Sequence, residues 1–239
     1  MALSMNLTII ITFIILATMM LIIHHLYVEK ERFYQGANFE YATGQWVKPP
    51  RHTYIARFDQ LRVYTGWMTW SFSLRIDATE GNWRNIFRIS ESYGLEWNGT
   101  GKPQDMGYDW HQDYFRRPAI FIVPGQYAIH ICHGSAWDWN NAFNIGVPST
   151  SHITLVWRPN NNYSWSWWSW WYPQCDVYVN GNLVATHTYP GYLIQPDQDA
   201  LLYTADRFYG ANNFAVKDFK IFPMPMNGDQ VRNLYNQTR

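Results

Sequence analysis

The chain has 239 residues, and its 18 Lys and Arg balance its 18 Asp and Glu. A formal charge of zero argues against a protein that binds nucleic acid by neutralising many phosphates, and 18% aromatic residues argue against a disordered chain. Two cysteines exclude a disulfide-rich scaffold and a four-cysteine zinc site.

The amino-terminal segment is strongly apolar. Residues 1–28 contain no Asp, Glu, Lys or Arg, and the run at 7–23 is interrupted only by threonines. A run of about 20 residues spans a hydrocarbon core of about 30 Å, whereas a cleaved signal peptide would need a basic start, a shorter run and small residues at its end. The sequence therefore predicts a transmembrane helix at 1–28 that contacts a lipid bilayer through residues 7–28, followed by a linker at 29–50.

Two features of the predicted anchored protein stay open. Lys30 and Arg32 directly after the span favour a cytoplasmic domain, while Asn-x-Ser/Thr sequons are compatible with the opposite side. Cys132 and Cys175 are either a disulfide pair or two buried thiols.

From residue 51 onward, short apolar and aromatic runs are separated by turn residues. Several runs alternate with a period of two, which is typical of half-buried strands; they lie at 69–77, 126–133, 152–158, 176–187 and 214–222. Asn180-Gly181 is a strong hairpin signal because both residues tolerate positive φ. The helical spacing of Val231, Leu234 and Tyr235 predicts one or two closing turns of helix. The pattern predicts an all-β domain at 51–239, built as a sandwich or jelly roll.

The order of these motifs resembles the concanavalin A-like lectin/glucanase superfamily, in its laminin-G-like branch. The resemblance is carried by five segments: WSFSLRID with NWRNIFRIS, RRPAIFIVPGQYAIHI, SHITLVWRP, VYVNGNLVATH and FAVKDFKIFPMPMNGDQVRNLY. It implies a two-sheet antiparallel jelly roll. The form with RRP before an apolar strand is similar to domains of large DNA viruses and bacteria. The fold hosts lectins, glucanases and structural modules, so it does not fix the function.

We find no catalytic motif in the sequence. A glucanase of this superfamily needs two carboxylates on one strand that point into the same groove. The nearest acidic spacings, Asp77/Glu80 and Glu91/Glu96, lack that alternation. The sequence therefore predicts that the chain is not an enzyme.

Metal binding is also not predicted, although two loops contain oxygen ligands suited to calcium. These residues are Asp105, Asp109, His111 and Asp113 in one loop and Asp138, Asn140 and Asn141 in the other. Without a fixed loop template, solvated acids and Asx turns explain them better than a calcium site does. We predict no cofactor, with Ca²⁺ as the alternative.

A tryptophan-rich insertion at 160–175 is the most informative local feature. Its indole rings could stack on sugars, enter a protein interface, lie at a membrane surface or fold back over the sheet. The predicted partner-contact or glycan-contact residues are Trp165, Trp167, Trp168, Trp170 and Trp171, with Trp137 and Trp139 in a second loop.

Together these features predict a non-catalytic, membrane-anchored structural or attachment protein. The first interpretation is a minor capsid or virion protein that ties an internal membrane to a protein shell, with protein neighbours in a lattice as partners. The alternatives are a membrane-bound carbohydrate-binding lectin and an accessory subunit of a membrane complex. The corresponding locations are the interface between a virion's internal membrane and its capsid, or a cell membrane; nucleic acid is not a predicted partner.

Overall fold

We describe the fold from a computed structural model of the chain. It describes residues 12, 14–22, 37, 39–50, 53–57, 61, 68–90, 118–132, 142–158, 174–189, 200–205 and 213–238. The chain divides into two compact units, Met1–Gly36 and Ala37–Arg239.

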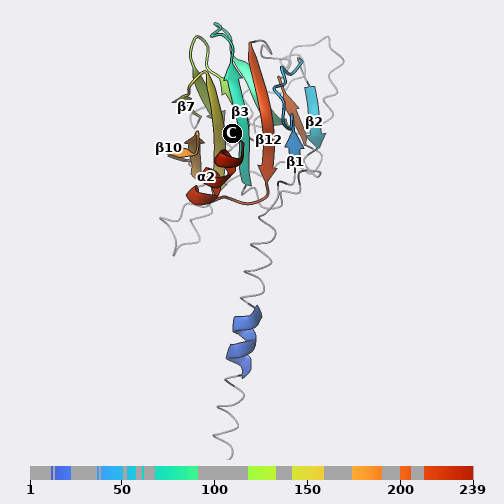
Figure 1. The fold of residues 1–239 in the computed structure, drawn as a ribbon, viewed down its shortest axis with the longest axis vertical. Coiled ribbons are helices and arrows are strands. Elements are labelled where there is room, and N and C mark those ends of the chain that lie inside the picture. The colour runs from blue at the N-terminus through green and yellow to red at the C-terminus, as the bar shows by residue number, and fades with distance from the viewer. Residues whose placement is uncertain are drawn as a thin grey trace, which may run out of the picture. The chain divides into compact units, whose positions relative to one another are not determined.

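The larger unit contains two antiparallel sheets, each with six strands among the described residues (Figure 1). Sheet A has the order β1 (Phe39–Tyr41), β12 (Phe214–Phe222), β3 (Met68–Ile76), β8 (Thr150–Arg158), β9 (Gln174–Val179) and β10 (Asn182–Thr188). Sheet B has the order β2 (Thr53–Arg57), β11 (Leu201–Thr204), β4 (Arg84–Ser90), β5 (Ala119–Ile122), β6 (Ala128–Cys132) and β7 (Phe143–Gly146). The predicted two-sheet antiparallel sandwich is confirmed.

Aromatic side chains fill the space between the sheets. Because side chains alternate along a strand, β3 points Trp70 into the core, where its ring lies 5.4 Å from both Trp157 and Phe219. Phe219 in turn stacks on Phe87 of sheet B at 3.8 Å. All four side chains are buried, so these contacts join the sheets into one core.

A second apolar cluster lies on the outer face of sheet A, under the helix α2 (Gly228–Gln237). Val231 and Leu234 of the helix pack with Val156 of β8, Tyr178 of β9 and Phe222 of β12. A capping box at Asn227 and Gln230 fixes the start of the helix. The predicted closing helix is thus present, and it covers one end of this face.

The structure contradicts the predicted location as a single-pass membrane protein. Within the amino-terminal run, the described helical residues are Thr12 and 14–22, and no helix among the described residues is long and apolar enough to cross a membrane. The predicted locations at a cell membrane or at a virion membrane–capsid interface are corrected with it. The bilayer contact predicted for residues 7–28 lies partly outside the described residues and is not supported.

Part of the segment predicted as a linker at 29–50 pairs with sheet A. Phe39–Tyr41 forms the strand β1, and Val47 makes an isolated bridge with Val216 of β12. The two cysteines are buried in different clusters, Cys132 on the outer side of sheet B and Cys175 in the core, and no disulfide joins them.

Candidate functional site

The tryptophans predicted as contact residues lie outside the described residues, in both loops. The loop acids considered for calcium also lie outside them. Within the described part of the chain, no group of three His, Cys, Asp or Glu side chains is placed to hold a metal ion. The site is therefore built from other residues.

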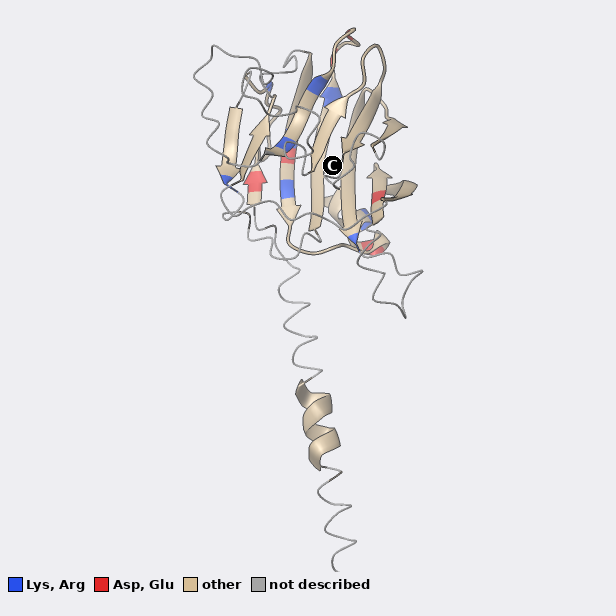
Figure 2. Cartoon of the chain, turned by 180° about the vertical axis from the view of Figure 1, so that it is seen from behind, with Lys and Arg blue, Asp and Glu red and all other residues tan. Residues whose placement is uncertain are grey.

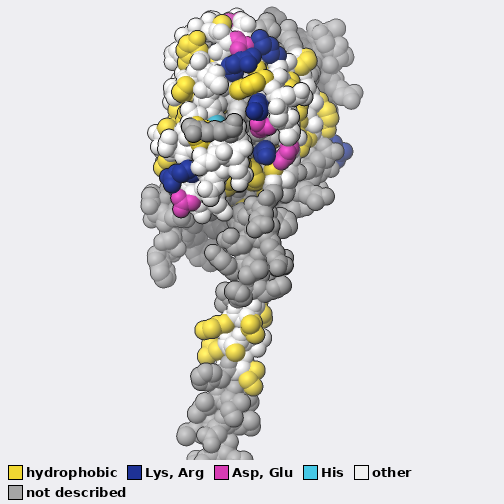
Figure 3. Space-filling model, in the orientation of Figure 1, with side chains coloured by type: hydrophobic (Ala, Val, Ile, Leu, Met, Phe, Trp, Pro, Cys, Tyr) yellow, Lys and Arg dark blue, Asp and Glu magenta, His cyan; other side chains and the backbone are white. Residues whose placement is uncertain are grey.

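Charged side chains gather on the outer face of sheet A. On the strands themselves, β12 carries basic, acidic and basic residues in turn beside an acidic position in β1 (Figure 2). The space-filling view of this face shows basic and acidic side chains in a band, with hydrophobic side chains among them (Figure 3). The end of this band farther from α2 contains an exposed tryptophan.

This end is formed by Trp46, Lys48, Arg75 and Asp77, which we name the Trp46 cluster. The guanidinium of Arg75 lies over the indole of Trp46, 5.1 Å from the ring centroid, within the range of a cation–π contact. Trp46 remains 37% exposed. An indole that is held in place and still partly open to solvent offers a flat apolar surface to a ligand.

The turn before Trp46 places it over sheet A. Gly44 adopts a positive φ of 72° and donates its backbone N–H to Oδ1 of Asp218 at 2.6 Å. Three residues later, Val47 and Val216 exchange backbone hydrogen bonds of 2.8 and 2.9 Å. These bonds align the segment with β12, so that Trp46 reaches Arg75 on the neighbouring strand β3.

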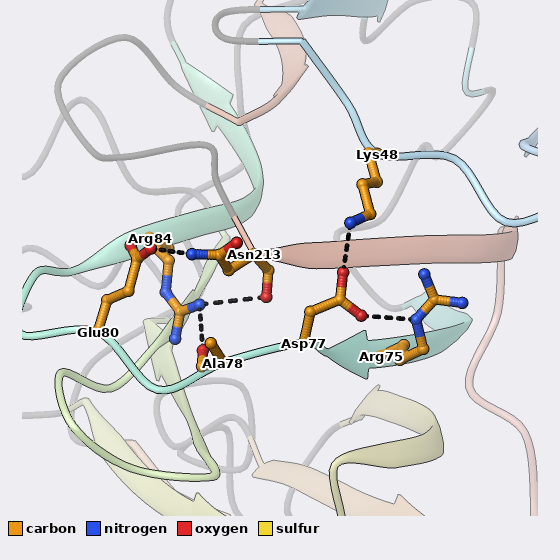
Figure 4. A network of polar contacts seen from close by, with 7 residues as sticks. All are labelled: Lys48, Arg75, Asp77, Ala78, Glu80, Arg84 and Asn213. Carbon is orange, nitrogen blue, oxygen red and sulfur yellow. Dashed lines mark hydrogen bonds and ion pairs between the residues drawn. The ribbon is translucent and has the colours of Figure 1, made fainter.

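Asp77 is held between two cations at the end of β3 (Figure 4). Lys48 Nζ lies 2.7 Å from Oδ2 and Arg75 Nε lies 2.7 Å from Oδ1. The hydrogen bonds from Lys48 and then Arg75 lower the pKa of Asp77. Asp77 is therefore a carboxylate at neutral pH and accepts hydrogen bonds, whereas a glycosidase acid would need a raised pKa.

A network of hydrogen bonds around the buried Arg84 lies next to Asp77 (Figure 4). The fully buried Arg84 donates from its NH1 group to the carbonyl oxygens of Ala78 at 2.8 Å and Asn213 at 3.3 Å. The Asn213 side chain donates to Glu80, and the Asn213 carbonyl also accepts from the backbone N–H of Asp77 at 2.8 Å. Arg84 thereby ties the loop after Asp77 to the start of β12.

A serine and a histidine also meet on this face, nearer to α2. His152 Nε2 lies 2.8 Å from Ser71 Oγ, while its Nδ1 faces Ser73 at 3.3 Å and Thr238 at 3.4 Å. Burial lowers the pKa of His152 to about 4. Among the described residues the ring nitrogens meet only hydroxyl groups, and Ser71 is buried. An activated serine needs access to substrate and a correctly oriented base, so this contact is structural.

Sequence reasoning missed the Trp46 cluster. It considered Asp77 and Glu80 only as a carboxylate pair, but the structure gives them different partners, two cations for Asp77 and Asn213 for Glu80. The signal that could have found the site is weak: a single Trp two residues before a Lys, outside any periodic run.

Comparisons with known proteins find no matching family model and no matching curated protein. Among solved structures, the chain is similar to a structure from work on botulinum neurotoxin type C, whose cell entry depends on interaction with two ganglioside molecules. The identity is 13%, the match covers 72% of this chain and 36% of the toxin chain, and the TM-score is 0.44. It is also similar to the binding domain of botulinum neurotoxin DC in complex with SialylT, with 13% identity over 72% of this chain and 35% of that chain and a TM-score of 0.44. The receptor-binding domain of botulinum neurotoxin type G matches with 12% identity over 72% of this chain and 38% of that chain, at a TM-score of 0.43. The chain spans little more than a third of the length of these structures.

Proposed function

We propose that this chain is a non-catalytic carbohydrate-binding domain of the concanavalin A-like type, with the Trp46 cluster as its glycan site. The observation that carries the proposal is a partly exposed indole fixed beside two cations and a carboxylate. A sugar ring offers apolar C–H faces to an aromatic ring and hydroxyl groups that both donate and accept hydrogen bonds. Arg75 and Lys48 supply donors, and Asp77 supplies an acceptor.

The absence of catalysis is part of this proposal. The acidic side chain beside Trp46 has a lowered pKa, and hydrolysis of a glycosidic bond needs a protonated carboxylic acid next to a second carboxylate. Attachment to protein neighbours, predicted from the tryptophan-rich loops, stays a prediction, since those loops lie outside the described residues.

A glycan array probed with the full chain tests the proposal. We expect retention on a subset of glycans and a loss of affinity of about tenfold or more in the Trp46→Ala variant, because the stacking surface is removed. Trp83→Ala is a matched control: Trp83 is 38% exposed, against 37% for Trp46, and lies immediately before β4 of sheet B. Binding to no glycan, or equal losses in both variants with both folded, would overturn the proposal.

A further inference from the structure

The polar surface beyond the Trp46 cluster follows two neighbouring strands toward α2. Arg75, Ser73 and Ser71 occupy alternate positions of β3 and therefore share its outer face, but Ser71 is buried, so only Arg75 and Ser73 of this column reach the surface. They pair in register with Ala215, Lys217 and Lys220 of β12. At about 3.4 Å per residue, the column from Arg75 to Ser71 covers about 14 Å.

A β-bulge brings the two lysines to the same face. Lys217 and Lys220 are three residues apart, so a regular strand would point them to opposite sides. The register of β12 against β3 shifts between them, and Asp218 has a positive φ of 53°. Bulges commonly re-aim side chains in this way near functional sites. Here the bulge is held by the backbone bond from Asp218 to Ala42 at 3.0 Å.

The charges along this strip are paired. Lys217 Nζ lies 3.5 Å from Asp218 Oδ2, and Lys220 Nζ lies 3.4 Å from Glu40 Oε1. Together with the Trp46 cluster, these ion pairs comprise four cations and three carboxylates (Lys48, Arg75, Lys217 and Lys220; Asp77, Asp218 and Glu40). A polyanion would have to displace a carboxylate from nearly every lysine or arginine that it met. An uncharged chain of hydroxyl groups can bind to the same side chains without separating the ion pairs.

The helix α2 bounds the strip at its other end. Phe222 and Val156, which lie farther along β12 and β8 on the same face, are buried beneath the helix. Tyr235 and Thr238 at its carboxyl end contact His152, next to Ser71 and Ser73. The strip therefore runs from Trp46 to the edge of α2.

We infer that the glycan site extends from the Trp46 cluster along β3 and β12 as far as Lys220, and that its ligand is an extended, uncharged glycan chain. This inference rests on the proposed function and adds the class of glycan. A single sugar would contact the Trp46 cluster alone, whereas a longer chain would also contact Ser73, Lys217 and Lys220.

Calorimetric titration of the full chain with neutral gluco-oligosaccharides tests this inference. The probes are disaccharides and hexasaccharides with β-1,3, β-1,4 and α-1,4 linkages, together with the linear neutral glycans retained on the array. We expect the longer member of a binding series to bind about tenfold more tightly. A Lys217→Ala/Lys220→Ala double variant should reduce its affinity to that of the disaccharide and leave disaccharide binding unchanged. Arg232→Ala, an exposed position on α2, is the control for loss of a surface cation.

The outcomes separate the two proposals. If short and long glycans bind equally and only Trp46→Ala weakens them, the glycan site stands and its extension is wrong. If sulfated or sialylated glycans bind more tightly than neutral ones and lose affinity steeply with added salt, the uncharged class is wrong. If no glycan binds, the proposed function itself fails. Should the double variant unfold, Ser73→Ala tests the same contact, and an undiminished preference for longer chains would contradict the extended site.

Discussion

The buried His152 predicts a loss of stability in mild acid. Its ring is enclosed by Ser71 and Ser73 of β3, by Tyr235 of α2 and by Thr238 directly after α2. Asp218 of β12 favours the protonated ring and Lys220 opposes it, but burial dominates and lowers the pKa from 6.5 to about 4. Protonation would place a charge where water has been excluded, next to hydroxyl groups that can rotate but carry no charge.

The size of the effect follows from the two pKa values. A group whose pKa is lower in the folded state stabilises the fold at pH values above its unfolded pKa. For His152 this contribution is complete above about pH 6.5 and disappears as the pH falls toward 4. The full difference corresponds to about 3 kcal/mol of unfolding free energy, of which about 2 kcal/mol is lost between pH 7 and pH 5.

Urea denaturation at a series of pH values measures this loss. His152→Gln removes the titrating group and keeps a side chain that can hydrogen-bond to Ser71. We expect the variant to be less stable at pH 7 and to lose about 2 kcal/mol less than the parent chain between pH 7 and pH 5. Parallel pH profiles for the two proteins would refute the assignment, because other acidic groups would then explain the whole dependence.

Four further substitutions test the fold and the site. Arg84→Ala should destabilise the chain by about 3–5 kcal/mol, measured by urea unfolding, because the Ala78 and Asn213 carbonyls lose a charged donor; destabilisation under 1 kcal/mol would contradict this. Trp70→Ala should lower the free energy of unfolding by a similar amount because core contacts are lost, and the denaturation midpoint should fall. Asn227→Ala should cost about 1 kcal/mol by removing the cap of α2, and an unchanged midpoint would speak against that cap. Lys48→Ala should change stability by less than about 0.5 kcal/mol yet weaken glycan binding, and equal binding would exclude Lys48 from the site.

The strands with strong alternation could be predicted from the sequence. The run at 69–77 corresponds to β3 (Met68–Ile76), and the run at 214–222 corresponds to β12. In β3 large apolar residues occupy every second position, and in β12 they do so on each side of the bulge, so that burial of one face favours a strand and fixes its register. The Asn180-Gly181 turn also lies where it was predicted, with both residues at positive φ.

The candidate site could not be predicted in the same way. Val47 lies outside any periodic run, and its bridge partner Val216 is far along the chain. Trp46 reaches Arg75 only because this bridge forms. The common face of Lys217 and Lys220 depends on a bulge, which strict alternation of side chains excludes. Both features arise from long-range backbone pairing, which a local pattern does not encode.

The energetics of the site separate stability from binding. Exposed ion pairs such as Lys48–Asp77 contribute about 0–1 kcal/mol, because water already solvates both charges. The buried Arg84 network, by contrast, would be costly to disrupt. The chain therefore keeps a rigid support below the surface and, above it, charged groups on which the fold depends little. Such groups can hydrogen-bond to a neutral ligand while their ion pairs stay intact, and this is the physical reason to place the binding site at Trp46 and not at the more deeply buried Ser71–His152 contact.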